Sequence, residues 1–272
     1  MTLMAFVSLP SGTLDVELTP AADSEASIRP PLVFLHEGLG SLGLWRGFPA
    51  TVRAASGEPS MLVYSRYGYG HSASAVLPRP VTYMHHEADV VLPALLQTLD
   101  VRRPILIGHS DGASIALLHA GATDDTSALL NDVAGLVLLA PHVFVEDVSL
   151  AGIAAARVAF ETTDLRPKLA RHHDDVDGAF RGWNDVWGSD AFRSWNITDR
   201  LPGITCSVLI VQGEDDAYGS VAQVTAIADG VSGRVETLVL PGVGHAPQFE
   251  AADATRAAIA SFIASIQAGP DR

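Results

Sequence analysis

Residues 104–114 read Pro104-Ile-Leu-Ile-Gly108-His109-Ser110-Asp111-Gly112-Ala113-Ser114. A short apolar strand runs into a Gly-x-Ser-x-Gly turn, and an Ala- and Leu-rich helix follows at once. Small residues two positions before and after the serine allow the backbones to pass one another at a sharp strand-to-helix turn. The helix N-terminus behind such a turn stabilises negative charge that develops beside it. The pattern therefore predicts a nucleophilic serine at Ser110.

Asp111 adjoins Ser110 and is the alternative nucleophile. With Asp111 at the apex of the turn, His109 would occupy a position that must be small, so Ser110 is favoured. A carboxylate at Asp111 would also oppose an anion forming nearby unless its charge is compensated. We expect an internal Arg or His partner for Asp111. The alternative is that Asp111 faces the pocket and selects substrates with a cationic or hydrogen-bond-donating group.

The rest of the chain alternates β-branched or Leu-rich runs with Ala-rich helical stretches. Near-continuous apolar runs are typical of parallel strands that helices cover on both faces. These runs are Leu32–Leu35, Met61–Tyr64, Ile105–Ile107, Leu136–Leu139, Val208–Val211 and Val235–Leu240. The expected helices are Glu87–Leu99, Ala113–Ala120, Val221–Ala228 and Ala252–Ile266. The alternation predicts an α/β fold with a mostly parallel sheet flanked by helices.

Two further segments complete the predicted organisation. The early runs Met4–Ser8 and Leu14–Leu18 are separated by a Pro-Ser-Gly turn and predict an antiparallel hairpin at the sheet edge. Residues 143–202 contain no good strand but several short helical patterns. We expect them to form a helical cap, or lid, inserted into a core domain made of residues 1–142 and 203–272.

A serine nucleophile needs a base, and the base needs a carboxylate that orients it. Of the ten histidines, His245 is best placed, because it follows the last strand and a Gly-rich turn. The acid is expected after the preceding strand, where Glu214, Asp215 and Asp216 stand in a row. Loop length favours Asp216 over Asp215.

The loop after the strand Leu32–Leu35 reads His36-Glu-Gly-Leu-Gly-Ser41. We expect the backbone N–H groups of Gly38 and Asp111 to form an oxyanion hole, with Leu39 as the alternative to Gly38. The same loop fits a dinucleotide fingerprint, Gly-x-Gly-x-x-Gly. The next strand, however, ends Tyr64-Ser-Arg-Tyr67, without the acidic residue that would hold a ribose. Dinucleotide binding is therefore not expected.

Other residues are expected in the substrate pocket on weaker grounds. The set comprises Glu37, Leu39, His142, Trp183 and Trp187. Trp183 and Trp187 share a helical face with Phe180 and form either an apolar wall for the substrate or packing between cap and sheet. His142 follows a strand at the same edge of the sheet and is either a pocket residue or a packed loop histidine.

Composition narrows the class of partner. The 272 residues contain 17 Lys and Arg against 31 Asp and Glu, a formal net charge of −14. Such a surface repels nucleic-acid phosphates and anionic lipid headgroups. No run approaches the roughly 18 apolar residues of a membrane span, and the N-terminus has no basic leader of a secretory signal. The single cysteine, Cys206, allows no intrachain disulfide, so a cytoplasmic location is expected.

No metal site is expected either. The pairs His85-His86 and His172-His173 have nearby aspartates, but their patterns are typical of solvated helix faces. His36-Glu37 lacks the second histidine that a zinc-peptidase helix requires, and it ends a strand.

Five motifs in this order resemble those of the α/β-hydrolase fold family, over nearly the whole chain. They are His36-Glu-Gly-Leu-Gly-Ser41, Arg66-Tyr-Gly-Tyr-Gly-His-Ser72, Gly108-His-Ser-Asp-Gly112, Gly213-Glu-Asp-Asp216 and Gly244-His-Ala-Pro247. The resemblance implies an eight-stranded sheet, a helical cap after the sixth strand and no cofactor. Two residues depart from the family pattern: Ser65 stands where an acidic residue is usual, and Glu37 where a glycine is usual.

The resemblance is to capped esterases, enol-lactonases and carbon–carbon bond hydrolases. We expect a serine hydrolase that cleaves a small-molecule carboxylic ester or lactone through an acyl-enzyme, acting as a monomer or homodimer. A carbon–carbon bond hydrolase or lyase would use the same three residues on a ketone. A ligand-binding member of the fold that does not catalyse a reaction is the alternative from another class.

Overall fold

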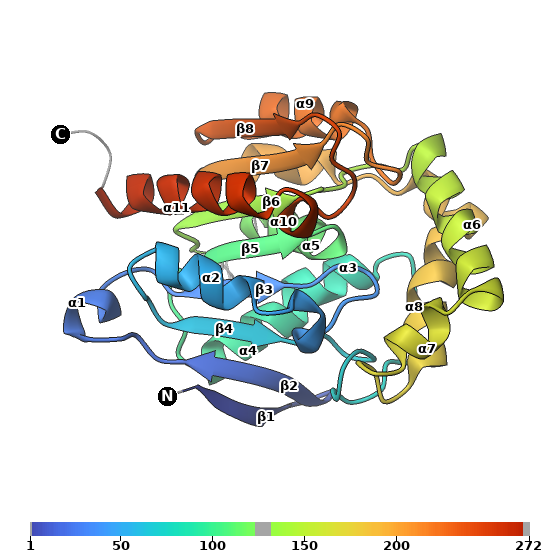
Figure 1. Ribbon diagram of the computed structural model, residues 1–272, viewed down its shortest axis with the longest axis horizontal. Helices are drawn as coiled ribbons and strands as arrows, with labels where there is room; N and C mark the ends of the chain where they lie inside the picture. The colour runs from blue at the N-terminus through green and yellow to red at the C-terminus, as the bar shows by residue number, and fades with distance from the viewer. Residues whose placement is uncertain (1, 123–131, 269–272) are drawn as a thin grey trace.

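The computed structural model describes residues 2–122 and 132–268, and its centre is an eight-stranded sheet (Figure 1). The strands are β1 (Leu3–Leu9), β2 (Gly12–Thr19), β3 (Leu32–Leu35), β4 (Met61–Tyr64), β5 (Ile105–His109), β6 (Gly135–Leu139), β7 (Ser207–Gly213) and β8 (Val235–Leu240). Their order across the sheet is β1-β2-β4-β3-β5-β6-β7-β8. β2 pairs antiparallel with β1 and β4, and the other neighbours are parallel. The predicted edge hairpin and mostly parallel sheet are confirmed.

Helices connect the strands and cover the sheet. The α-helices are α1 (Ser24–Ser27), α2 (Phe48–Ala55), α3 (Tyr83–His86), α4 (Leu92–Thr98), α5 (Asp111–Ala120), α6 (Asp147–Thr162), α7 (Leu165–Leu169), α8 (Val176–Trp187), α9 (Val221–Gly230), α10 (Pro247–Glu250) and α11 (Ala252–Ala268). Shorter turns of other helical types are η1 (Leu42–Trp45), η2 (Glu87–Val91), η3 (Asp190–Ser194) and η4 (Thr198–Gly203).

The two faces of the sheet bury two separate apolar clusters. Alternate residues of a strand point to opposite faces, so Val33 and Leu35 of β3 join one cluster, while Leu32 and Phe34 join the other. The first cluster packs against α3, α4, α5 and α9, and the second against α2 and α11. In Figure 1, α2 and α11 lie in front of the sheet. Coverage on both faces explains why the parallel strands read as continuous apolar runs.

The helix expected at Glu87–Leu99 is longer and less regular than predicted. It begins at Tyr83 and contains a wide π turn, η2, before α4. Pro93 lies at the start of α4 and has no N–H to donate, and a widened turn is one way in which a helix adjusts to a missing hydrogen bond. The turn carries Glu87, which is 3% exposed, into the interior.

Between β6 and β7 the chain leaves the sheet. Helices α6, α7 and α8 lie together beyond the carboxyl ends of the parallel strands (Figure 1). Phe180, Trp183 and Trp187 are all buried on α8. The division into a core domain and a cap of residues 143–202 remains a prediction. Across residues 2–122 and 132–268, no helix combines the length and apolar character that a membrane span requires.

Candidate active site

Ser110 occupies a strained turn between β5 and α5. Its φ of 53° and ψ of −118° lie outside the regions that serine ordinarily adopts. Its N–H donates to the carbonyl oxygen of Leu139 at 2.9 Å, which ties the turn to β6. A Cβ at Gly108 would overlap the backbone of Gly112, and a Cβ at Gly112 would overlap the carbonyl oxygen of Leu35. Both glycines are therefore required for the close approach of β3, β5 and α5.

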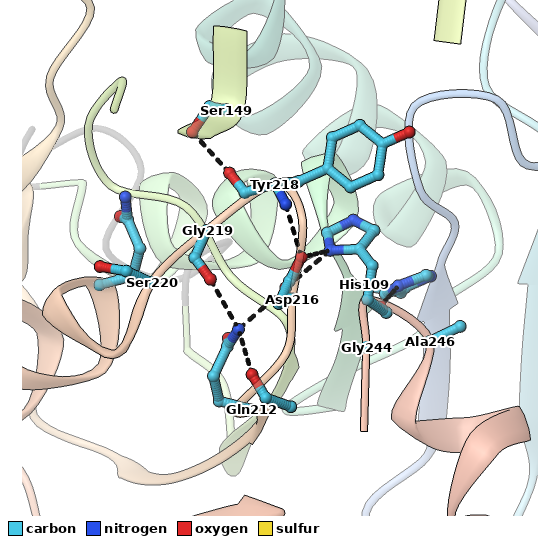
Figure 2. Close-up of polar contacts among 12 residues, drawn as sticks. His109, Ser149, Gln212, Asp216, Tyr218, Gly219, Ser220, Gly244 and Ala246 are labelled. Atoms are coloured by element: carbon cyan, nitrogen blue, oxygen red, sulfur yellow. Dashed lines mark hydrogen bonds and ion pairs between the residues drawn. The ribbon is translucent and has the colours of Figure 1, made fainter. Parts of the chain in front are cut away.

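His245 and Asp216 form a paired acid and base at the ends of β8 and β7. The Nδ1 atom of His245 lies 2.9 Å from Oδ1 and 2.8 Å from Oδ2 of Asp216. The same carboxylate accepts the N–H of Tyr218 at 2.8 Å and the side-chain amide of Gln212 at 2.8 Å (Figure 2). These donors fix the carboxylate, so the imidazole that it holds is fixed too.

The neighbouring carboxylates have different surroundings. Asp215 and Glu214 are exposed, whereas Asp216 is 7% exposed. Burial by itself would raise the pKa of Asp216, but the hydrogen bond and charge of His245 and the Tyr218 N–H hold that pKa below its ordinary value. Of the two aspartates weighed from the sequence, the structure places Asp216 against His245.

Two neutral histidines surround His245. Gln248 donates to Nδ1 of His109 at 3.1 Å, so Nε2 of His109 carries the proton and donates to the carbonyl oxygen of His245 at 2.8 Å. The ring of His142 lies with its centroid 5.6 Å from that of His245. Burial, followed by the charge of His245, lowers the pKa of both His109 and His142 to about 3. Neither adds positive charge to the site near neutral pH.

Two backbone N–H groups are available beside Ser110. Asp111 is the first residue of α5, and N–H groups in the first turn of a helix have no acceptor within it. The N–H of Gly38 has no partner among the described residues. The N–H of Leu39, by contrast, donates to the carboxylate of Glu37 at 2.6 Å. This difference favours Gly38 over Leu39 as an oxyanion donor.

The side chain of Asp111 points into the protein. It is 0% exposed and lies 3.6 Å from Nη2 of Arg66. The hydroxyl of Tyr83 donates to Oδ2 at 2.5 Å, and Nε1 of Trp187 donates to Oδ1 at 3.2 Å. The expected internal partner is thus Arg66. The alternative, in which Asp111 faces the pocket and selects substrates, is wrong, because the carboxylate is fully buried against Arg66, Tyr83 and Trp187.

One cavity of about 520 Å³ brings most of the predicted residues together. Ser110, His245, Gly38, Glu37 and Leu39 line it. The other residues that line it are mainly apolar and come from η1, α6, α7, α8, the loop after β7 and α10. They include Leu44, Trp45, Ala155, Ala156, Ala159, Leu165, Leu169, Trp183, Tyr218 and Phe249. The Ser110 hydroxyl has no partner among the described residues, which leaves it available to His245 or to a substrate.

Two expected pocket residues lie behind this wall. Trp187 is 2% exposed, and its Nε1 is taken by Asp111 and the hydroxyl of Tyr83. His142 is 2% exposed and packs edge-on against Trp187 at 5.4 Å between ring centroids. Of the aromatic face predicted on α8, the structure places Trp183 in the cavity and Trp187 in the interior. The helical period predicted that Trp183 and Trp187 share a face of α8. It could not predict that only Trp183 lines the cavity.

Glu37 is the one carboxylic acid among the described residues that line the cavity. Its Oε2 accepts the Leu39 N–H, and its Oε1 has no hydrogen-bond partner and remains accessible. Burial raises the pKa of this carboxyl above its ordinary value. Glu37 can therefore exchange a proton, or accept a hydrogen bond from a bound molecule, closer to neutral pH than an ordinary glutamate.

Sequence reasoning did not single out several supporting side chains. Arg66, Tyr83 and Gln212 each contact a residue of the site from another segment. Arg66 begins the motif that ends at Ser72, but no rule of sequence spacing connects this arginine to Asp111. Within the described ranges, no group of three or more His, Cys, Asp or Glu side chains is arranged to hold a metal ion.

The strand order and the turn at Ser110 together define an α/β-hydrolase fold. A family model described as "Alpha/beta hydrolase family" matches residues 32–258. The chain belongs to this family, and at that level it is a hydrolase.

Individual relatives agree with this assignment. The chain is 30% identical over 241 residues to the "Putative carbamate hydrolase RutD" of Klebsiella pneumoniae strain 342, covering 82% of this chain and 87% of that one. Among solved structures, the enol-lactonase from Burkholderia xenovorans LB400 superposes with a TM-score of 0.70 at 18% identity, over 96% of this chain and 100% of the other. An esterase from Exiguobacterium antarcticum superposes with a TM-score of 0.71 at 18% identity, over 96% of this chain and 100% of the other. At these identities the two structures support the fold alone.

Proposed function

We propose that this protein is a serine hydrolase that cleaves a carboxylic ester or lactone of a small molecule through an acyl-enzyme. The observation that carries the proposal is the contact of both Asp216 oxygens with His245, at a cavity that also contains Ser110 on its strained turn. A nucleophile, a base and an orienting acid in chain order Ser, Asp, His are the parts that acyl transfer requires.

Each residue has a defined role in the proposed reaction. The Ser110 hydroxyl attacks the carbonyl carbon while Nε2 of His245 takes its proton. The tetrahedral oxyanion is bound by the N–H groups of Gly38 and Asp111. When the intermediate collapses, His245 returns the proton to the leaving oxygen, and an ester links the acyl group to Ser110. Water then attacks the acyl carbon while His245 takes its proton, and His245 returns that proton to the Ser110 oxygen as the carboxylic acid leaves.

Asp216 keeps the base in the correct tautomer. Because its oxygens contact Nδ1, the imidazole proton stays on that atom and the lone pair of Nε2 is left for Ser110. The carboxylate also stabilises the imidazolium that forms during the reaction. The depressed pKa of Asp216 keeps it ionised throughout the neutral range.

We propose residues 143–202 as a cap over the site. Their helices α6, α7 and α8 supply Ala155, Leu165, Leu169 and Trp183 to the cavity wall. An apolar wall of this kind suits the hydrocarbon part of an ester or lactone. Glu37 adds a carboxylate to this lining. The single cysteine supports the proposal of a cytoplasmic setting.

Carbamate hydrolysis is a second candidate. The similarity to a protein named as a carbamate hydrolase favours it, and so does Glu37, which can accept a hydrogen bond from the carbamate N–H. The same three residues would attack the carbamate carbonyl. Carbon–carbon bond cleavage and binding without catalysis remain as alternatives from the sequence.

A substrate panel tests the proposal. Purified wild-type protein and Ser110→Ala are assayed on p-nitrophenyl esters, lactones, N-substituted carbamates and vinylogous diketones, with identification of the products. We expect Ser110-dependent release of an alcohol or hydroxy acid. Turnover that Ser110→Ala retains in full, at unchanged folding, would contradict the assignment.

A further inference from the structure

The carbonyl oxygen of Glu37 is held by three donors from inside the protein. Nη2 of Arg66 donates to it at 2.9 Å, and the N–H of Gly40 donates at 3.0 Å. Nε2 of His36 accepts the backbone N–H of Arg66 at 3.0 Å, so the ring proton is on Nδ1, which donates to the same carbonyl at 2.7 Å. The buried Arg66 thus acts on this carbonyl directly and through His36.

The Glu37 carbonyl and the Gly38 N–H belong to one peptide unit. That unit is planar and trans, so its C=O and N–H point in opposite directions. Since the carbonyl points towards the buried guanidinium, the N–H points to the other side, where Gly38 lines the cavity with Ser110. Whatever fixes the carbonyl therefore fixes the direction of the N–H.

The same nitrogen of Arg66 also reaches the second donor residue. Nη2 lies 3.6 Å from Oδ2 of Asp111, and both side chains are fully buried. The Tyr69 ring lies under the guanidinium at 4.9 Å. The hydroxyl of Tyr83 donates to the same Oδ2 of Asp111, and Nε1 of Trp187 donates to Oδ1. Arg66 therefore connects the loop after β3 with the first residue of α5.

We propose that Arg66 is a positioning residue that sets both N–H groups of the oxyanion hole, by holding the Glu37 carbonyl and the Asp111 carboxylate with one guanidinium nitrogen. The inference rests on the proposed function, because it assigns a task to Arg66 only where an oxyanion forms. Arg66 does not touch the substrate. It acts through the two peptide groups that do.

Two variants separate positioning from simple stability. Arg66→Lys keeps the buried charge, but the lysine ammonium ends about one bond short of the position of Nη2 and lacks the fixed orientation of a planar guanidinium. Arg66→Gln combined with Asp111→Asn removes both members of the ion pair together, so neither charge loses its partner. The buried Glu87 keeps Arg79 as a neighbouring positive charge. Arg53→Lys is the matched control: Arg53 also donates to backbone carbonyls, of Pro59 at 2.8 Å and Pro20 at 2.9 Å, but on α2 and outside the cavity lining.

The readout is kcat and KM for a p-nitrophenyl ester, together with the affinity for a trifluoromethyl ketone, whose serine adduct carries the oxyanion. We expect Arg66→Lys and the double variant to lower kcat about 10- to 100-fold, with KM changed less than about threefold. The affinity for the ketone should fall by the same factor as kcat. Arg53→Lys should leave all three values unchanged.

The failures can be told apart. If wild-type protein shows no Ser110-dependent turnover, the proposed function fails and this inference fails with it. If wild-type protein is active and both folded Arg66 variants keep its kcat and ketone affinity, the inference alone is overturned. Loss of folding in both variants, with Arg53→Lys intact, would assign Arg66 to stability only and would also overturn it.

Discussion

The Nδ1 atom of His245 lies within 2.9 Å of both carboxylate oxygens of Asp216. The carboxylate cannot turn away from the ring, because Tyr218 and Gln212 donate to it from its own loop and strand. The pair is therefore set before any substrate arrives, and His245 lines the same cavity as Ser110.

Asp216→Asn should remove catalysis without unfolding the protein. An amide at this position can donate to Nδ1, which favours the tautomer with the proton on Nε2, where it cannot accept from Ser110. We expect kcat to fall about 10⁴-fold, with KM little changed. Steady-state kinetics on an ester check this, with Asp215→Asn as the control, because Asp215 is exposed in the same loop. Equal losses from the two substitutions would contradict the assignment of Asp216.

Acid should destabilise the protein through its buried histidines. His109 and His142 have pKa values lowered to about 3 by burial, whereas an unfolded histidine titrates near 6.5. The unfolded state therefore binds more protons between these values, and the free energy of unfolding falls as pH falls through that window. Each histidine contributes a slope of about 1 kcal/mol per pH unit.

The measurement is urea denaturation between pH 7 and pH 5. His109→Gln should make the dependence on pH shallower by about 1 kcal/mol per unit. His86→Gln, an exposed histidine on α3, is the control for the substitution itself. Parallel curves for wild type and His109→Gln would show that His109 does not stay neutral in the folded protein.

Glu37 should govern the preference for substrates with N–H groups. Its accessible Oε1 can accept a charge-assisted hydrogen bond, which Glu37→Gln weakens. We expect the ratio of kcat/KM for an amino-substituted ester over its hydrocarbon analogue to fall about tenfold in Glu37→Gln. Because burial raises the pKa of Glu37, the wild-type ratio should increase with pH as this carboxyl ionises. A ratio that depends neither on the substitution nor on pH would exclude this role.

Gly38 and Trp183 should be coupled through space. A Cβ at Gly38 would overlap the Nε1 edge of the Trp183 indole, so Gly38→Ala must displace the ring. We expect Gly38→Ala to lower the free energy of unfolding by about 2 kcal/mol in the wild type, and by much less when Trp183→Ala has already vacated the space. A double-mutant cycle by urea denaturation measures this. If the two substitutions change the free energy of unfolding additively, the Trp183 indole does not lie against Gly38.

The sequence was sufficient for features with a short-range cause. Apolar runs located the six parallel strands, β3 to β8, and the Pro-Ser-Gly turn located the edge hairpin. Gly108 and Gly112, on either side of Ser110, allow the close backbone approach that the spacing of the motif predicted. These predictions depend on periodicity and on steric limits within a few residues, which any sequence displays directly.

Features that depend on packing between distant segments were not predictable in the same way. The direction of the Asp111 side chain depends on Arg66 and Tyr83, which come from two other segments. The helical period put Trp187 on the correct face of α8, but the cavity ends before it. In the sequence, only Pro93 pointed to the π turn at Glu87–Val91. The first two features are set by tertiary contacts that override the local pattern.

The identity of the nucleophile is the central claim, and covalent labelling measures it most directly. Wild-type protein, Ser110→Ala and Asp216→Asn are treated with a fluorophosphonate, and the modified peptide is located by mass spectrometry. The account predicts a single adduct on Ser110 in the wild type, none in Ser110→Ala, and much slower labelling in Asp216→Asn. An adduct at another residue, or none in active wild-type protein, would contradict it.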